Sequence, residues 1–282
     1  MSAKLKTWEA AVSWLMRQPD KQELVLDCYY DESINDAAER YWKSEEWNAV
    51  KQLLPEELGS ALDLGAGRGI ASYALAKEGW NVLAVEPDQS DIVGAGAIRL
   101  LQASSTLPIK VISEFGESIQ SNTNSIDLFF ARQVLHHADN LNQLCAEAFR
   151  VLKPGGTFIA VRDHVISSKK DMPRFFDKHP LHHLYGGENA YKVAEYLDAM
   201  TNAGFHVKQV IRPFDSVINY APYTKETLKE YFITKCKKIP GIGKLSFILK
   251  FDVAYKILIK LLTVVDRRPG RLYSFVCVKP EN

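Results

Sequence analysis

The sequence predicts an α/β fold in which a parallel sheet is wrapped by helices. From Ser60 onward, short apolar runs rich in β-forming residues alternate with longer amphipathic runs of helical character. A glycine-rich turn directly follows the first of the apolar runs. The chain has 282 residues, of which 46% are hydrophobic and 24% charged, so it is long enough to bury a full core.

Seven apolar runs have the length and composition of β-strands. They are Ala61–Leu64, Asn81–Val85, Ile109–Ser113, Ile126–Ala131, Thr157–Arg162, Phe205–Ile211 and Leu272–Val278. Helical patterns lie between them, at Ile70–Lys77, Gln89–Gln102, Leu141–Leu152 and Asn189–Asn202. Gly204 suits a left-handed position just past the end of the last helix. Each helix therefore gives the crossover that parallel strands need.

The flanking segments divide the chain into four parts. We expect a helical, aromatic cap at 1–54, a core at 55–215, a helical insertion at 216–270 and a last core strand at 271–282. In the insertion, Asp252, Lys256 and Lys260 recur every four residues, which indicates an amphipathic helix and excludes a membrane span. Such a helix packs on the sheet, pairs with a second copy in a homodimer, or lies on a membrane surface through residues 243–262.

Composition excludes several classes of protein. Lys and Arg number 35 against 34 Asp and Glu, so no overall field attracts a nucleic acid. The N-terminus has charges on both sides of a short apolar stretch and lacks a signal-peptide pattern, which predicts a cytoplasmic location. The cysteines form no CxxC pair, which argues against a zinc ribbon or a disulfide framework; they are Cys28, Cys145, Cys236 and Cys277.

The most specific signal is the segment Asp63-Leu64-Gly65-Ala66-Gly67-Arg68-Gly69, which leaves a strand and opens a helix. Its glycines let the backbone turn tightly and approach a ligand closely. The NAD fingerprint needs a further glycine at position 70, where this chain has Ile70. The Asp63 carboxylate would repel a pyrophosphate and attract an ammonium group. S-adenosylmethionine (SAM), which carries an amino-acid tail, therefore fits better than NAD.

Glu86 ends the second strand, one helix and one strand after the glycine segment. At this place a carboxylate can accept hydrogen bonds from both hydroxyls of a ribose. The spacing predicts an adenosine across the carboxyl ends of the first two strands.

Four segments in this order resemble the type 11 branch of class I SAM-dependent methyltransferases, which contains the ubiquinone and menaquinone C-methyltransferases. The segments are LDLGAGRG, AVEPD, ESIQSNTNSIDLFFARQVLHH and EAFRVLKPGG, and the resemblance covers about Tyr41 to Val161. It implies a Rossmann-like, doubly wound sheet of seven strands with the last strand antiparallel. It also implies SAM as cofactor and S-adenosylhomocysteine as product.

The resemblance assigns cofactor contacts residue by residue. Asp63, Gly65, Ala66, Gly67 and Gly69 would line the methionine part of SAM, and Glu86 and Pro87 the ribose. The family's Gly-Asp-Ala-Glu reads Ser-Glu-Phe-Gly-Glu here, so adenine would lie against Glu114 and Phe115, or against Glu117. Arg132 and Val134 follow the fourth strand and would face the sulfonium. Tyr30 and Arg40 precede the segment that carries the resemblance, and independently of it we expect them to close over SAM, with Arg40 near its carboxylate.

Candidate acceptor residues follow the fifth strand, at the edge where open α/β sheets bind ligands. Arg162, Asp163 and His164 lie there, and His164 is a candidate general base, because an unperturbed imidazole titrates near neutral pH. His137, in the family's Leu-His-His motif, either takes part in catalysis or shapes the site. The loop 179–188 is a candidate lid or acceptor pocket through His183, Tyr185 and Glu188.

We expect no bound metal, because the histidines of that loop, His179, His182 and His183, have no matching second cluster. The acceptor is expected to be a small molecule, a glycan or a lipid-linked compound, with O-methylation favoured. C-methylation of a quinone-like ring and a non-catalytic SAM-binding scaffold remain alternatives. Base methylation of nucleic acid is disfavoured, because the position after the fourth strand reads Ala-Arg-Gln-Val and not Asn-Pro-Pro-Tyr.

Overall fold

A computed structural model describes residues 7–178, 182–183, 185–239 and 243–281. The expected strands form one seven-stranded sheet in the order β3-β2-β1-β4-β5-β7-β6. They are β1 (Ser60–Leu64), β2 (Asn81–Val85), β3 (Ile109–Ile112), β4 (Ile126–Arg132), β5 (Leu152–Val165), β6 (His206–Ile211) and β7 (Arg271–Val278). The prediction of a seven-stranded α/β sheet is confirmed.

The pairing of the strands fixes where ligands can bind. Strands β1 to β5 pair in parallel, whereas β7 runs antiparallel to both β5 and β6. The chain leaves β1 toward β2 and β3, then returns to place β4 on the other side of β1. This reversal opens a crevice beyond the carboxyl ends of β1 and β4, the usual ligand site of open α/β sheets.

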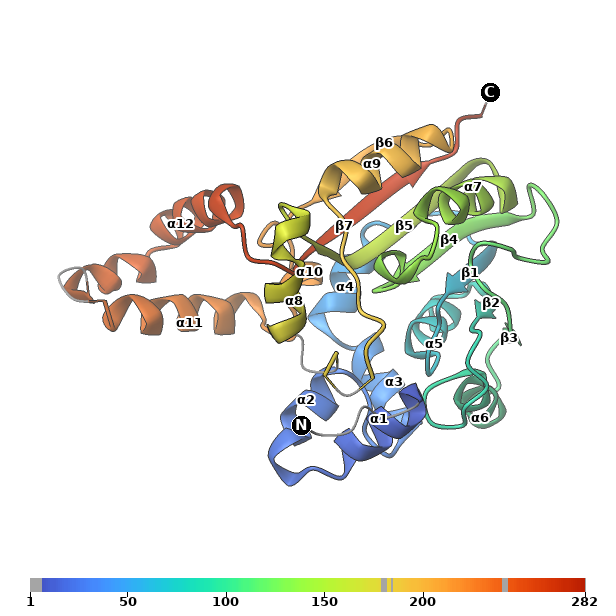
Figure 1. Ribbon diagram of the computed structural model, residues 1–282, viewed down its shortest axis with the longest axis horizontal. Coiled ribbons are helices and arrows are strands. Elements are labelled where there is room, and N and C mark those ends of the chain that lie inside the picture. Colours follow the sequence, from blue (N-terminus) through green and yellow to red (C-terminus); the bar gives the residue numbers. More distant parts are fainter. Residues whose placement is uncertain (1–6, 179–181, 184, 240–242, 282) are drawn as a thin grey trace.

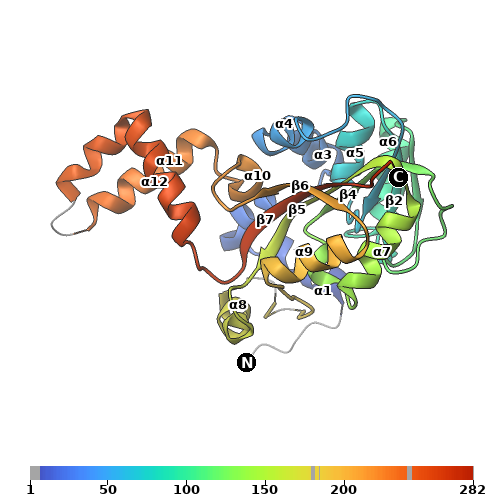
Figure 2. The same cartoon turned by 90° about the horizontal axis from the view of Figure 1, so that it is seen from above.

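Helices cover both faces of the sheet (Figure 2). The helices α7 (Leu141–Val151) and α9 (Val193–Asn202) pack on one face, where Leu144, Ala148 and Met200 join its buried core. The other face is covered by α3 (Ile34–Trp42), α4 (Glu45–Lys51), α5 (Ile70–Lys77) and α6 (Ala95–Ser105). The remaining elements before α9 are α1 (Trp8–Met16), η1 (Pro19–Lys21), α2 (Gln22–Asp27), η2 (Leu135–His137), η3 (Lys169–Asp171) and α8 (Met172–Lys178).

Two expected helices begin later than the sequence pattern suggests. The helix expected from Gln89 begins at Ala95, because Asp88 Oδ1 and Ser90 Oγ accept hydrogen bonds from backbone amides at 90 and 92. Such local bonds stabilise a turn in place of the helix. The helix expected from Asn189 begins at Val193, because Tyr191 forms a bridge with Val165 of β5.

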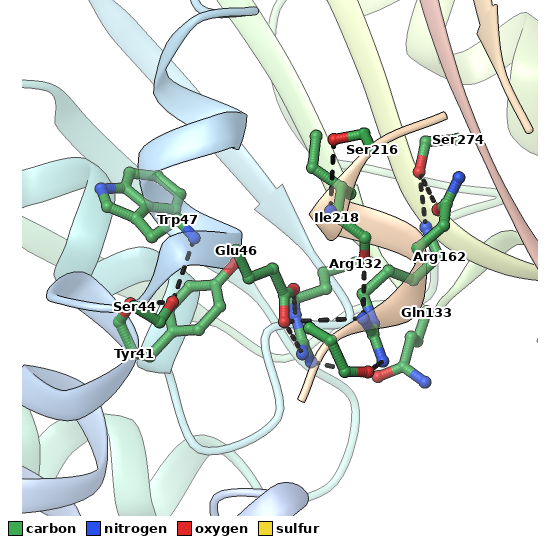
Figure 3. Close-up of polar contacts among 12 residues, drawn as sticks. Tyr41, Ser44, Glu46, Trp47, Arg132, Gln133, Arg162, Ser216, Ile218 and Ser274 are labelled. Atoms are coloured by element: carbon green, nitrogen blue, oxygen red, sulfur yellow. Dashed lines mark hydrogen bonds and ion pairs between the residues drawn. The ribbon is translucent and has the colours of Figure 1, made fainter. Parts of the chain in front are cut away.

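A buried ion-pair network joins the N-terminal helices to the carboxyl edge of the sheet (Figure 3). Glu46 of α4 is 2% exposed, and its carboxylate accepts hydrogen bonds from Arg132 Nε at 2.7 Å and Nη2 at 3.1 Å. Arg162 Nη1 lies 3.7 Å from the same carboxylate and donates to Ile218 O, while its Nη2 donates to Ala221 O. The network therefore ties α4, β4, β5 and the segment around α10 (Val217–Tyr220) together.

Charge balance within this network decides the protonation of Glu46. Burial raises the pKa of Glu46, but the two guanidinium groups of Arg132 and Arg162 outweigh it and hold the pKa below its ordinary value. Arg132 also lies over the rings of Tyr29 and Tyr41, at 5.6 and 5.1 Å from their centroids. The carboxylate is thus ionised at neutral pH, and its contribution to stability is lost as the pH falls through its lowered pKa.

The insertion before β7 projects away from the sheet as a helical hairpin (Figure 1). It consists of α11 (Lys225–Lys237), η4 (Gly243–Lys250) and α12 (Asp252–Val265). The interpretation of α12 as a helix packed on the sheet is wrong, because it contacts η4 and leaves an apolar stripe exposed. In the described part of the chain, no helix combines the length and apolar character that a membrane crossing requires.

We predict that Glu46→Gln destabilises the protein by about 3–5 kcal/mol, because it removes the charge that faces two buried guanidinium groups. Urea unfolding monitored by circular dichroism measures this loss. Glu45→Gln is the matched control, since Glu45 is the exposed neighbour in the same helix and its change should cost less than about 0.5 kcal/mol. Equal losses in the two variants would contradict a structural role for the network.

Candidate functional site

The glycine segment forms a strained turn between β1 and α5. Gly65, Gly67 and Gly69 have φ angles of 57°, 54° and 80°, a region that side chains with a Cβ rarely adopt. A Cβ on Gly65 would lie 2.6 Å from Val134 Cγ2, so this glycine also permits the close approach of the β4 loop. Within the described part of the chain, a Cβ on Gly67 would meet one atom within 4 Å, Val93 O at 3.8 Å, so a side chain there would not clash at its Cβ.

Glu86 clamps the glycine turn from the end of β2. Its Oε2 accepts a hydrogen bond from the Gly67 amide at 2.7 Å, and its Oε1 accepts one from the Asp88 amide at 2.9 Å. Burial raises the pKa of Glu86, partly offset by these two amides. The carboxylate thus holds the turn in shape, and each of its oxygens has a further lone pair for a ligand hydroxyl.

Asp63 lies at the base of the same turn and is 1% exposed. Ser72 Oγ donates a hydrogen bond to its Oδ2 at 2.6 Å. Burial, together with the nearby Glu86, raises the pKa of Asp63 to about 7, although the Ser72 bond opposes the shift. A ligand cation beside this carboxylate would therefore be strongly favoured, because it would offset the cost of burying the charge.

These groups open into one cavity of about 760 Å³ at the carboxyl edge of the sheet. This volume is within the range of small-molecule binding sites. Sixteen of the residues singled out from the sequence line it: Tyr30, Asp63, Gly65, Ala66, Gly67, Glu86, Pro87, Glu114, Phe115, Arg132, Val134, His137, Arg162, His164, Tyr185 and Glu188. Glu117, the alternative to Glu114, lines it as well.

Four other selected residues lie outside the lining. Arg40 does not line the cavity, and Asp31 accepts two hydrogen bonds from it, at 2.7 and 2.8 Å. Gly69 lies behind the turn as the N-cap of α5, and Asp163 is fully buried beneath His136. His183 is exposed, and its Nε2 contacts Asp177 O at 3.1 Å. His179 lies outside the described residues.

The far end of the cavity is lined by histidines and a glutamate. His136 Nδ1 lies 2.9 Å from Asp163 Oδ1, and His164 Nδ1 donates to Gly270 O at 2.9 Å. Glu188 Oε2 is 3.9 Å from His136 Nε2 and 4.0 Å from His137 Nε2. Burial raises the pKa of Glu188 to about 7. Three elements distant in sequence therefore bring imidazoles and a carboxylate together at one place.

Sequence reasoning missed three kinds of residue at this site. His136 stands beside His137 in one motif, and the sequence does not distinguish the two. In the structure, His136 Nδ1 contacts the Asp163 carboxylate, and His136 lines the cavity. Arg68 is the lining cation next to the N-terminal segment, and its Nη1 donates to Tyr29 O and Asp31 O. Trp8 reaches the lining from α1 and contacts Tyr185, with ring centroids 5.8 Å apart. No spacing in the sequence predicts these long-range contacts.

Comparison with known proteins identifies the central part of the chain. Residues 62–160 match the family described as "Methyltransferase domain". Over this matched segment, the chain is similar to that family. The matched residues run from β1 into β5 and include the glycine turn, Glu86 and His136.

Relatives and solved structures agree with this assignment. The chain is 32% identical over 110 residues to an uncharacterized methyltransferase of Mycobacterium bovis, covering 38% of this chain and 41% of the relative. It is 30% identical over 107 residues to a ubiquinone biosynthesis O-methyltransferase of Methylobacterium nodulans, covering 38% of this chain and 42% of the relative. The fold is similar to phosphoethanolamine N-methyltransferase 2 of Haemonchus contortus, with a TM-score of 0.56, 17% identity, and coverage of 90% and 60% of the two chains.

The sequence similarity covers only part of each chain. The chain spans about two fifths of the length of the curated relatives that it matches. Glu46, Arg162, His164 and Glu188 lie outside the matched residues 62–160. The matched segment thus contains the glycine turn and Glu86 at one end of the cavity, whereas much of the other end is built by residues outside that segment.

Proposed function

We propose that this protein transfers a methyl group from SAM to an oxygen of a small-molecule, glycan or lipid-linked acceptor, with S-adenosylhomocysteine as the product. The observation that carries the proposal is the cavity beyond β1 and β4, which joins a clamped glycine turn to a cluster of imidazoles and a carboxylate. The matched family supports methyl transfer, and the Haemonchus contortus enzyme of similar fold was solved with S-adenosylhomocysteine bound.

The turn end of the cavity suits SAM. Asp63 would receive the ammonium of the methionine part, while Gly65 and Gly67 allow the backbone to approach it. The ribose hydroxyls would donate to the oxygens of Glu86, and adenine would lie beyond Pro87, near Glu114 and Phe115. This arrangement directs the sulfonium methyl toward the histidine end of the same cavity.

The histidine end suits an acceptor hydroxyl. His164 Nδ1 donates to Gly270 O, so the neutral ring accepts a proton at Nε2. We propose that the acceptor oxygen lies beside His164, His136 and Glu188, with Arg162 and Tyr185 along its sides. Methyl transfer is then a direct displacement, in which positioning and the exclusion of water give most of the rate. His137 would support the acceptor at the cavity mouth.

The projecting hairpin supports a lipid-linked acceptor at a membrane surface. On α12, Val253, Ile257, Leu261 and Val264 are 56–72% exposed and follow one another on successive turns. Phe247 and Phe251 extend this apolar stripe, at 56% and 64% exposure. Residues 224–268 contain eleven Lys and Arg against four Asp and Glu. An apolar stripe with excess positive charge fits an anionic lipid surface.

Gly67→Val should abolish SAM binding, because the new side chain would extend into the cavity without first meeting protein atoms. Calorimetric titration with SAM measures the affinity, and we expect a loss of about 100-fold or more, in line with the several kcal/mol of binding that a blocked site loses. Gly155→Val is the matched control, since Gly155 also has a positive φ, of 77°, but lies away from the cavity. Wild-type affinity in Gly67→Val would rule out this cofactor site.

The hairpin proposal predicts binding to vesicles that contain anionic lipid and weak binding to neutral vesicles. Sedimentation with vesicles of phosphatidylcholine, with or without phosphatidylglycerol, measures the difference. The double variant Ile257→Asp/Leu261→Asp should lose this binding, whereas a double change of the exposed β6 residues His206 and Lys208 to Asp should retain it. Loss of self-association in the first variant, without any vesicle binding by the wild type, would assign the stripe to a homodimer instead.

A further inference from the structure

Three side chains at the acceptor end form a set with the chemistry of a metal site. The ligand atoms of His136, His164 and Glu188 all lie within 4.8 Å of one another. They come from η2, from the end of β5 and from the loop before α9. Two imidazoles and one carboxylate are a common protein ligand set for divalent transition-metal ions.

The surroundings of the two histidines orient them as metal ligands. Asp163 Oδ1 lies 2.9 Å from His136 Nδ1, and Gly270 O accepts from His164 Nδ1 at the same distance. Metal-binding histidines typically donate their second ring nitrogen to a carboxylate or a backbone carbonyl, which fixes the ring and raises the basicity of the other nitrogen. Both partners are present here, and Nε2 of His136 lies 3.9 Å from Glu188 Oε2.

The three ligand atoms, which lie within 4.8 Å of one another, would have to move closer together to share an ion. Ligand atoms that share a tetrahedral ion lie roughly 3.4 Å apart, since bonds from zinc to nitrogen or oxygen are about 2.1 Å. His136 Nε2 and Glu188 Oε2 are 3.9 Å apart, so each needs to move by a fraction of an ångström. Gly186 and Gly187 precede Glu188 with φ angles of 97° and 76°, and a glycine pair permits such an adjustment.

We propose that His136, His164 and Glu188 bind one divalent transition-metal ion of the zinc type, and that this ion holds the acceptor oxygen. Magnesium and calcium are disfavoured, because they prefer oxygen ligands throughout. Three protein ligands leave a coordination position open toward the cavity, as in catalytic zinc sites. The inference rests on the proposed function for its chemistry, although the ion site can be tested without it.

With the His164 ring bound to the ion, the ion would take the place of His164 in activating the acceptor hydroxyl. Coordination lowers the pKa of the hydroxyl, the O–H bond breaks and the proton passes to solvent water. The resulting alkoxide or phenolate, held on the ion, attacks the methyl carbon of SAM. The carbon–sulfur bond breaks and its electron pair stays on sulfur, which gives the methyl ether and neutral S-adenosylhomocysteine. The site therefore selects acceptors that present an oxygen donor, such as a phenol or a catechol.

Metal titration of the EDTA-treated full chain tests this inference. We expect saturable binding of one Zn²⁺ per chain by calorimetry, and visible absorption bands of low-coordinate Co²⁺ when cobalt replaces zinc. His164→Ala and Glu188→Gln should each weaken Zn²⁺ binding by at least about 10-fold, the lower end of the effect of disturbing a metal site. His206→Ala is the control. His206 is an exposed histidine on β6, and its loss should leave Zn²⁺ binding unchanged.

SAM affinity measured on the same proteins separates the two proposals. If SAM binds while Zn²⁺ does not, or while Zn²⁺ binds equally to all variants, the metal site is wrong and the proposed function stands. If Zn²⁺ binds to the wild type and is lost in His164→Ala and Glu188→Gln while SAM fails to bind, the metal site stands and the proposed function is wrong. The metal site is also overturned if His206→Ala loses the ion as the two ligand variants do.

Discussion

The buried contact of Glu46 with Arg132 and Arg162 is the constraint on which the shape of the site depends. Arg132 ends β4, and Arg162 lies in β5 with a φ of 65°. The pairing of β5 with β7 shifts register between Ala160 and Asp163, around this residue. Such a register shift changes the direction in which the following side chains point. Asp163 is thereby placed under His136, and His164 lines the cavity.

The same contact explains why the cavity has two chemically distinct ends. Residues 62–160 contribute the glycine turn, held by hydrogen bonds to Glu86, and a buried carboxylate at Asp63. The N-terminal helices, held to the sheet through Glu46, contribute aromatic walls that include Tyr30. The segments after β5 contribute the polar groups at the other end. Cofactor and acceptor can therefore change independently in such a fold, because they contact different parts of the chain.

The sequence predicted most of what depends on local pattern. The apolar runs predicted all seven strands, although β5 begins at Leu152 and not at Thr157 as expected, and the glycine turn with Glu86 lies in the cavity. The features that the sequence did not reveal depend on contacts between distant segments. Arg40, expected near a ligand, pairs with Asp31 and lies outside the cavity lining. The sequence did not predict that His136, His164 and Glu188 form a cluster. They are separated by 28 and 24 residues along the chain, and the fold of the sheet brings them together.

Hydrogen–deuterium exchange with and without saturating S-adenosylhomocysteine tests the central claim most directly, because it reports where the ligand binds in the intact chain. The account predicts slower exchange of amides in 63–71 and 86–93, the glycine turn and the segment that follows Glu86, with unchanged exchange in the hairpin at 225–265. Unchanged exchange in both turn segments at saturating ligand, or protection confined to the hairpin, would contradict it.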